Sequence, residues 1–192
     1  MNRIILASSS PFRRELLTRL HLEFNILSPD IDESTLEDET PSELVQRLAR
    51  EKANTVAKKL ADVIVIGSDQ VAAIGNEILG KPGSLENAIE QLKIVSGKRV
   101  TFHTGLCVVH SNSALVQTED VKFVVEFKVL SEEKIQRYLN KEPAFNCAGS
   151  FKSEGLGISL INRMVGDDPT ALIGLPLIKL TQMLEHIGVE VP

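Results

Sequence analysis

A basic side chain falls on the apolar face of the first predicted helix. On the helix that follows the segment ILASSSP, Leu16, Leu17 and Leu20 form an inward stripe at helical spacing, and Arg13 of ILASSSPFRRELL lies on the same stripe. Arg13 belongs to the first turn, beside free backbone N–H groups and the hydroxyls of residues 8–10. These groups predict an anion pocket that includes Ser8 and Arg13. An ordinary serine cap, with an arginine that reaches solvent, is the alternative.

A second basic side chain faces inward on the long helix predicted to begin at the capping box of Thr40 and Glu43. Lys52 lies four residues after Leu48, on the line of apolar positions that faces the core. A buried lysine needs an anionic partner or a water-filled cleft. Lys52 is therefore a second candidate for binding an anion, and a lysine reaching solvent from a groove edge is the alternative.

An acidic side chain follows the most hydrophobic strand of the sequence. The run VIVIG at residues 63–67 is typical of a strand covered on both faces, and Ser68, Asp69 and Gln70 come next. We expect Asp69 just past the end of this strand, where ligands of α/β sheets gather. A carboxylate there can bind a divalent metal, orient a water or accept its proton. An aspartate that only caps a turn is the alternative.

Three further charged positions carry weaker signals. Lys81, in Gly80-Lys81-Pro82, brings another cation close to Asp69 in the sequence. Glu33 belongs to an acidic loop, and by itself that loop is explained by solvation. Glu154 lies in the glycine-punctuated stretch GSFKSEGLG, whose backbone can approach a flat ligand closely. A solvated loop carboxylate is the simpler interpretation of Glu154.

The elements that must position these residues alternate between strand and helix. Strands are predicted at residues 3–7, 24–27, 63–67, 71–79 (a hairpin turning at 75–76), 101–110, 121–130 and 158–161. Helices are predicted at residues 11–20, 40–60, 84–97 and 131–138, with a last helix ending before Gly188. In the strand at 121–130, the odd-numbered residues through Val129 alternate strictly and predict one buried face. The fold class is therefore α/β, a mixed central sheet flanked by helices, with two lobes, a cleft between them and one domain over 1–192.

Composition excludes several classes of function. The 192 residues are 43% hydrophobic and carry a net charge of −5, so a broad basic surface for nucleic acid is not expected. Cys107 and Cys147 lie far apart and predict reduced thiols, and the four histidines lack zinc-ligand spacing. No apolar stretch is long enough for a signal peptide or a membrane span, which predicts a cytoplasmic protein. The chain length is compatible with a homodimer.

The motifs taken in order resemble those of one known family. They are ILASSSPFRRELL, the Asp32-Glu33 pair, Lys52 in AREKA, GSDQ, GKP, the Thr104-Gly105 pair, AGSFKSEGLG and GLPL. Their order and their spread over nearly the whole chain resemble the Maf family. The resemblance implies a Maf/ITPase-like fold and a nucleoside triphosphate pyrophosphatase, which cuts between the α and β phosphates. It also implies a divalent cation, Mg²⁺ or Mn²⁺, and a small nucleotide as substrate.

The resemblance also assigns roles to single positions. Asp69 matches the residue that accepts the proton of the attacking water. Arg13, Lys52 and Lys81 match basic positions that hold the triphosphate, and Glu33 matches an acidic position near the metal, where Asp69 is a second ligand. Cations and metal together would neutralise the charge that develops on the phosphates.

Three positions bear on the base. Phe12, Gln70 and Glu154 stand where the dTTP- and UTP-hydrolysing branch of the family has arginine, threonine and glutamine, and they are similar to the 7-methyl-GTP branch. That branch has tryptophan at the position of Phe12, and phenylalanine offers a smaller aromatic face. Methylation at N7 makes guanine cationic, which suits an aromatic face and a carboxylate. Glu154 can alternatively accept hydrogen bonds from the guanine N1–H and amino group.

Two alternatives remain open at this point. One is a broader pyrophosphatase for other modified nucleotides, which removes them from the nucleotide pool. The other is a nucleotide-binding regulator of cell division, because the family name derives from a link to septum formation. A regulator needs no acidic residue beside inward-facing cations.

Overall fold

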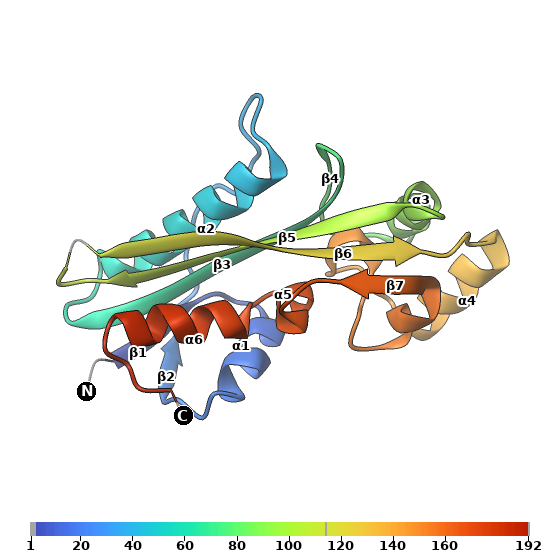
Figure 1. The fold of residues 1–192 in the computed structure, drawn as a ribbon. Helices are drawn as coiled ribbons and strands as arrows, with labels where there is room; N and C mark the ends of the chain where they lie inside the picture. Colours follow the sequence, from blue (N-terminus) through green and yellow to red (C-terminus); the bar gives the residue numbers. More distant parts are fainter. Residues whose placement is uncertain (1–2, 114, 192) are drawn as a thin grey trace. The chain divides into compact units, whose positions relative to one another are not determined.

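The computed structural model of the protein describes residues 3–113 and 115–191 (Figure 1). These residues pack into two compact units. Unit 1 contains the chain up to Asp69, residues Thr104–Val121 and the chain from Asp168 onward. Unit 2 contains Gln70–His103 and Lys122–Asp167.

The strands form one mixed sheet, as the sequence predicts. They are β1 (Arg3–Ala7), β2 (Phe24–Ile26), β3 (Val63–Ile74), β4 (Glu77–Leu79), β5 (Arg99–His110), β6 (Val116–Phe127) and β7 (Ile161–Val165). The order across the sheet is β2-β1-β3-β5-β6-β7, and β4 pairs with β3. Strand β1 is parallel to β2 and β3, whereas β4 is antiparallel to β3 and β7 is antiparallel to β6. The predicted mixed α/β class is therefore confirmed.

The first four helices begin where the sequence places their caps. The helices are α1 (Pro11–Thr18), α2 (Pro41–Ala57), α3 (Leu85–Val95), α4 (Glu132–Lys141), α5 (Pro169–Ile173) and α6 (Leu177–His186), with two 3₁₀ turns, η1 (Ala148–Ser150) and η2 (Leu156–Leu160). Ser10, Thr40, Ser84 and Ser131 each accept a hydrogen bond from the backbone N–H three residues further on. At Thr40 the predicted capping box with Glu43 is complete. These caps fix the residue at which α1 and α2 start, and so fix the phase of their inward faces.

Unit 1 has a core on each face of β1 and β3. On one face Leu6 and Ile66 pack with the leucines of α1 and α6, and on the other Ile5 and Val65 pack with α2. Figure 1 shows α2 and α6 on opposite sides of this part of the sheet. Successive side chains of a strand point to opposite faces, so both faces of VIVIG are buried, as predicted.

Aromatic rings pack together in unit 2. The ring of Phe151 lies 5.8 Å from that of Phe102 on β5 and 5.2 Å from that of Phe127 on β6, measured between ring centroids. Phe151 follows η1 directly and is buried. These ring contacts attach the start of the glycine-rich stretch to the sheet.

One strand is longer than predicted, and this changes the position of Asp69. Strand β3 continues without a break from Val63 to Ile74, so Asp69 lies inside the strand and not just past its end. The polar run at residues 68–70 contains neither proline nor a turn residue with positive φ, so nothing ends the ladder there. The predicted hairpin turn at residues 75–76 is present between β3 and β4.

Two other predictions of elements were wrong, and one helix was missed. Strand β6 ends at Phe127, and Val129 is 85% exposed in the connection to α4. The predicted strand was too long at this end because the alternating pattern of apolar residues continues beyond the last paired residue. Residues 156–160 form η2, and the strand predicted at 158–161 begins only at Ile161. The short helix α5 was not predicted, although Asp168 followed by Pro169 is an N-cap signature.

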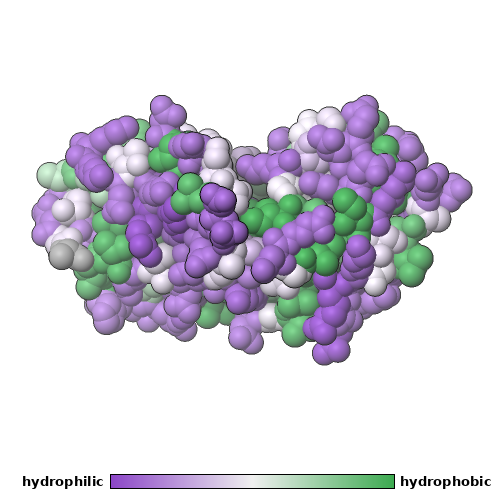
Figure 2. All heavy atoms as spheres, turned by 90° about the horizontal axis from the view of Figure 1, so that it is seen from above, coloured by the Kyte–Doolittle hydropathy of each residue, from purple (hydrophilic) through white to green (hydrophobic). Residues whose placement is uncertain are grey.

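The described part of the chain contains no helix that is long and apolar enough to cross a membrane. Hydrophobic side chains reach the surface in patches that hydrophilic side chains separate (Figure 2).

Candidate active site

Two carboxylates meet one lysine in unit 1. The Lys52 ammonium on α2 lies 2.6 Å from Oδ1 of Asp69 on β3 and 2.7 Å from Oε1 of Glu33. Lys52 is only 5% exposed and Asp69 only 7%, so this is a buried ion pair that the more exposed Glu33 joins from the loop before α2. Lys52 faces inward toward anionic partners, as its position on the helix predicts.

Two glycines allow α2 to approach the sheet closely enough for this contact. A Cβ at Gly67 would lie 2.2 Å from the Ala49 carbonyl oxygen, and one at Gly105 would lie 2.0 Å from the Val45 carbonyl oxygen. Both oxygens belong to the backbone of α2, so any side chain at either glycine would force the helix away. Gly67 is two residues before Asp69 on β3, and therefore faces the same helix.

The Arg13 side chain is held by a backbone carbonyl near the C-terminal end of the chain. Its Nε donates a 2.8 Å hydrogen bond to the carbonyl oxygen of Gly174, which also accepts a 3.0 Å bond from the Ser68 hydroxyl. Burial lowers the pKa of the Arg13 guanidinium, and the nearby carboxylates of Asp69 and Glu33 raise it in opposition. An arginine remains charged in either case, so unit 1 contains a second, partly buried cation near the same two carboxylates.

The turn that carries Gly174 is itself fixed by a buried carboxylate. Asp168 is 3% exposed and caps α5 by accepting bonds from the backbone N–H and the hydroxyl of Thr170. Its other oxygen accepts a 2.8 Å bond from the backbone N–H of Ile178 in α6. Gly174 has a φ of 123°, which disfavours any other residue at this helix end. Asp168 thus holds the loop that presents the carbonyl acceptor to Arg13.

The other two predicted residues of unit 1 lie around α1. Ser8 is buried, and its hydroxyl oxygen accepts a 3.1 Å bond from the backbone N–H of Ser10, the N-cap of α1. Phe12 is partly buried in the first turn of α1, next to Arg13. The structure therefore brings Ser8, Phe12 and Arg13 to one helix start.

In unit 2, the glycine-rich stretch is fastened by Glu142 at the end of α4. Oε1 of Glu142 lies 3.2 Å from the Lys152 ammonium, and its Oε2 accepts a hydrogen bond from the backbone N–H of Leu156. A Cβ at Gly155 would lie 2.3 Å from Oε1 of Glu142, so the chain passes close to this carboxylate. Glu154 itself is exposed and accepts a bond from the Ser153 hydroxyl.

Comparison with known proteins supplies the family. Residues 3–187 match the family described as Maf-like protein. The chain belongs to the Maf family. Three curated relatives are named 7-methyl-GTP pyrophosphatase: those of Alcanivorax borkumensis, at 54% identity over 98% of this chain and 96% of the relative, of Pseudomonas aeruginosa, at 53% over 98% of each, and of Colwellia psychrerythraea, at 49% over 100% and 96%. Among solved structures, the Ham1 protein of Staphylococcus aureus aligns with a TM-score of 0.48 at 18% identity, over 65% of this chain and 71% of that chain.

The predicted site residues of this Maf protein divide between the two units. Ser8, Phe12, Arg13, Glu33, Lys52 and Asp69 belong to unit 1, and Gln70, Lys81 and Glu154 belong to unit 2. Gln70 is partly buried on β3, and Lys81 is exposed in the connection between β4 and α3. Burial raises the pKa of the Cys147 thiol to about 11, with Glu154 raising it further and Lys152 lowering it. The carboxylate of Glu154 is thus close enough to Cys147 for its negative charge to disfavour the thiolate.

Three residues that support the candidate site were missed from the sequence. Ser68, Gly174 and Asp168 have short side chains or none, and they act through one backbone carbonyl or one helix cap. The Asp168-Pro169 pair carried a signal, since aspartate before proline is a common helix start. Nothing in the sequence indicated that the Gly174 carbonyl would accept a bond from Arg13, 161 positions away.

The acidic residues of the Maf site fit a hard divalent cation. No group of three His, Cys, Asp or Glu side chains suited to a metal occurs within residues 3–113 and 115–191. Glu33 and Asp69 nevertheless place oxygens on the same Lys52 ammonium, and Mg²⁺ is commonly bound by one or two carboxylates together with substrate phosphates and water. The donor set suits a cation that arrives with the nucleotide rather than one held by the protein alone.

Proposed function

We propose that this Maf protein is a nucleoside triphosphate pyrophosphatase that hydrolyses 7-methyl-GTP to 7-methyl-GMP and diphosphate. The observation that carries the proposal is the buried pair of Lys52 and Asp69, which Glu33 joins from an exposed loop and near which Arg13 is held. It combines cations that can bind the phosphates with a carboxylate that can accept a proton from the attacking water. The curated relatives, about half identical over nearly their full lengths, support the substrate.

In the proposed reaction a water attacks the α-phosphorus and the bond to the bridging oxygen of the β-phosphate breaks. The water's oxygen becomes part of 7-methyl-GMP, its proton moves to Asp69, and the bridging oxygen leaves with the diphosphate. Oδ1 of Asp69 is bonded to Lys52, so we assign the proton to Oδ2. Lys52 holds the carboxylate in one orientation, which is what a general base requires.

The basic residues are assigned to the phosphates. Arg13 is partly buried, and its Nε is already bonded to the Gly174 carbonyl, which directs the remaining N–H groups. Ser8 provides a hydroxyl for a phosphate oxygen, and the start of α1 contributes the partial positive charge of a helix N-terminus. Lys52 and Lys81 add charge that offsets what develops on the diphosphate as it leaves.

We also propose a divalent cation, Mg²⁺ or Mn²⁺, as cofactor. Glu33 and Asp69 would hold it together with the phosphates, and it would supply charge neutralisation and a polarised phosphoryl oxygen. Entry of the cation requires Lys52 to share or release its two carboxylates, which it contacts at 2.7 and 2.6 Å.

Phe12, Gln70 and Glu154 are assigned to the base. The methylated guanine carries a positive charge, so an aromatic face and a carboxylate stabilise it more than a neutral base. Glu154 is exposed on a stretch that Glu142 fastens, so its carboxylate is available on a fixed backbone. Gln70 contributes an amide that can bond another edge of the base.

A nucleotide panel tests the proposal. The purified protein is given 7-methyl-GTP, GTP, UTP, dTTP and other modified nucleotides with Mg²⁺ or Mn²⁺, and diphosphate release is measured. We expect kcat/KM for 7-methyl-GTP to exceed that for UTP at least tenfold. Equal turnover of UTP and 7-methyl-GTP would contradict the assigned specificity, and equal turnover of many modified bases would support the broader pyrophosphatase.

Two properties outside the site belong to the same proposal. We place the activity in the cytoplasm, where nucleoside triphosphates are made and consumed. A homodimer is proposed from chain length alone, and light scattering of the purified protein measures it.

A further inference from the structure

The loop that carries Glu33 has little hydrophobic support. Residues 27–40 form no regular structure between β2 and α2, and residues 32–38 are all exposed. Of the large apolar side chains in residues 27–40, Leu36 is 58% exposed, Leu27 is 37% exposed and Ile31 is partly buried. A segment that buries so little apolar surface must be held by polar contacts.

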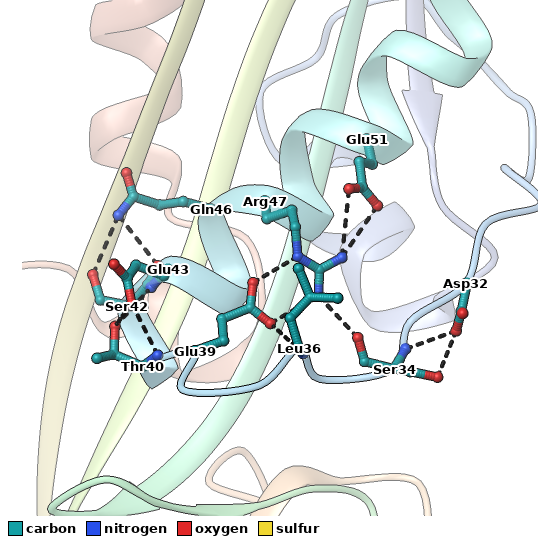
Figure 3. Close-up of polar contacts among 10 residues, drawn as sticks. All are labelled: Asp32, Ser34, Leu36, Glu39, Thr40, Ser42, Glu43, Gln46, Arg47 and Glu51. Carbon is teal, nitrogen blue, oxygen red and sulfur yellow. Dashed lines mark hydrogen bonds and ion pairs between the residues drawn. The ribbon is translucent and has the colours of Figure 1, made fainter.

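One arginine supplies most of those contacts from the side of α2. Nε and Nη2 of Arg47 bond the two oxygens of Glu39 at 2.6 and 2.8 Å, and Nη2 also donates a 2.9 Å bond to the Ser34 carbonyl oxygen. Its Nη1 lies 3.3 Å from Oε2 of Glu51, one turn further along the helix. Figure 3 shows the guanidinium at the centre of this arrangement, with Glu39 and Ser34 on the loop side and Glu51 on the helix side.

Arg47 and Glu39 form a charged pair that is largely shielded from solvent. The Glu39 side chain is only 7% exposed and the Arg47 side chain 21%. The hydrogen bonds from Arg47 lower the pKa of Glu39, so its carboxylate stays ionised, and Oε2 also accepts a 3.0 Å bond from the backbone N–H of Leu36. A bidentate pair of this kind fixes both partners in one geometry.

Residues on both sides of Glu33 are held by hydrogen bonds. Asp32 accepts bonds from the backbone N–H and hydroxyl of Ser34, which closes the turn immediately around Glu33. Arg47 then ties Ser34 to α2, the helix that carries Lys52 five residues further on. The carboxylate of Glu33 thereby reaches the Lys52 ammonium.

We propose that Arg47 is a positioning residue for the acidic cluster: it fastens the loop at Ser34 and Glu39 so that Glu33 is held against Lys52 beside Asp69. The consequence for catalysis rests on the proposed function, but the effect on the loop does not. Lysine cannot replace Arg47, because an ammonium lacks the planar fork that bonds both oxygens of Glu39 and a carbonyl together.

The test compares Arg47→Met and Arg47→Lys with the control Arg50→Met, which changes an exposed arginine on the same helix. Amide hydrogen exchange is measured on the full chain without nucleotide. We expect exchange of the Ser34 and Leu36 amides to rise at least tenfold in Arg47→Met, less in Arg47→Lys, and not at all in Arg50→Met. Amides inside β1 and β3 should keep their protection in all three, which separates loosening of the loop from unfolding. Unchanged exchange at Ser34 and Leu36 in Arg47→Met would overturn the proposal.

A double-mutant cycle with Glu33→Gln tests the catalytic consequence. In the wild-type background we expect Glu33→Gln to lower kcat/KM for 7-methyl-GTP at least tenfold. In the Arg47→Met background it should lower kcat/KM less than threefold, because Glu33 is then no longer held at the site. Equal, additive losses would show that Arg47 does not act through Glu33. Absence of hydrolysis by the wild-type protein would contradict the proposed function instead, and would leave the exchange result to decide the role of Arg47.

Discussion

Lys52 and Asp69 are 17 positions apart in the chain, and the lysine Nζ lies 2.6 Å from the aspartate Oδ1 in a buried pair. The contact joins a helix to a strand, so it depends on how closely α2 packs on β3. Gly67 and Gly105 make that packing possible because the backbone of α2 occupies the space of their missing side chains. The chemistry proposed for Asp69 therefore depends on glycines that take no part in it.

Removal of the lysine should damage both stability and activity. Lys52→Met leaves Asp69 as a buried carboxylate without its cation, which costs about 3–5 kcal/mol in the free energy of unfolding. Activity should fall about 100- to 1,000-fold, as for loss of one charged group at a transition state. Urea denaturation and steady-state kinetics measure the two effects. Lys52→Met combined with Asp69→Asn should recover part of the stability and none of the activity; no recovery of stability would show that the pair is not what Lys52 contributes.

A methyl group at Gly67 should move Lys52 away from Asp69 without changing either residue. Gly67→Ala places a Cβ against the Ala49 carbonyl, so α2 must shift outward, at a cost of about 1–3 kcal/mol or more. We expect a lower melting temperature and at least a tenfold lower kcat. Gly80→Ala is the matched control, since a Cβ there meets no atom within 4 Å. If both variants melt alike, the close approach of α2 is not required.

The charge of Glu154 should decide the preference for a cationic base. Glu154→Gln keeps the shape and a hydrogen-bond acceptor but removes the charge, so kcat/KM for 7-methyl-GTP should fall about 10- to 100-fold while GTP changes little. Glu185→Gln, at an exposed position of α6, is the control. An equal loss on both nucleotides would assign Glu154 to folding or to the phosphates.

Cys147 should respond slowly to alkylation and should report on Glu154. Its pKa is raised to about 11 by burial and by Glu154, so at pH 8 only about one thiol in a thousand is ionised. Iodoacetamide labelling, followed by mass spectrometry, should accelerate as the pH approaches 11. In Glu154→Gln the pKa should be lower, because a nearby negative charge has been removed, and the curve should move toward lower pH. An unmoved curve would contradict a position of Glu154 close to the thiol.

The sequence predicted the parts of the site that depend on local periodicity. Arg13 and Lys52 were expected to face inward because each falls on an apolar stripe, and in the structure Lys52 is buried and Arg13 is partly buried, with its Nε bonded to the Gly174 carbonyl. The mixed sheet and the caps of α1 and α2 were also predicted, since strand runs and capping residues are local signals.

Long-range geometry was not available from the sequence. Strand β3 continues through Asp69 and pairs with β4 at residues 72–74, beyond the polar run, and no residue at 68–70 indicates this. The bond from Arg13 to the Gly174 carbonyl joins the two ends of the chain through a backbone atom that every residue possesses. Glu33 was interpreted from its own surroundings as a solvated loop residue, and only the fold brings it to Lys52.

The role assigned to Asp69 is tested by following the products formed from 7-methyl-GTP by the wild-type protein and by Asp69→Asn. The wild-type protein with Mg²⁺ should yield 7-methyl-GMP and diphosphate in equal amounts, detected by chromatography and phosphorus NMR. Asp69→Asn should bind 7-methyl-GTP with an affinity within about tenfold of the wild type, by calorimetry, and release product at least about 100-fold more slowly. Release of monophosphate to leave 7-methyl-GDP, or an Asp69→Asn variant as active as the wild type, would contradict the account.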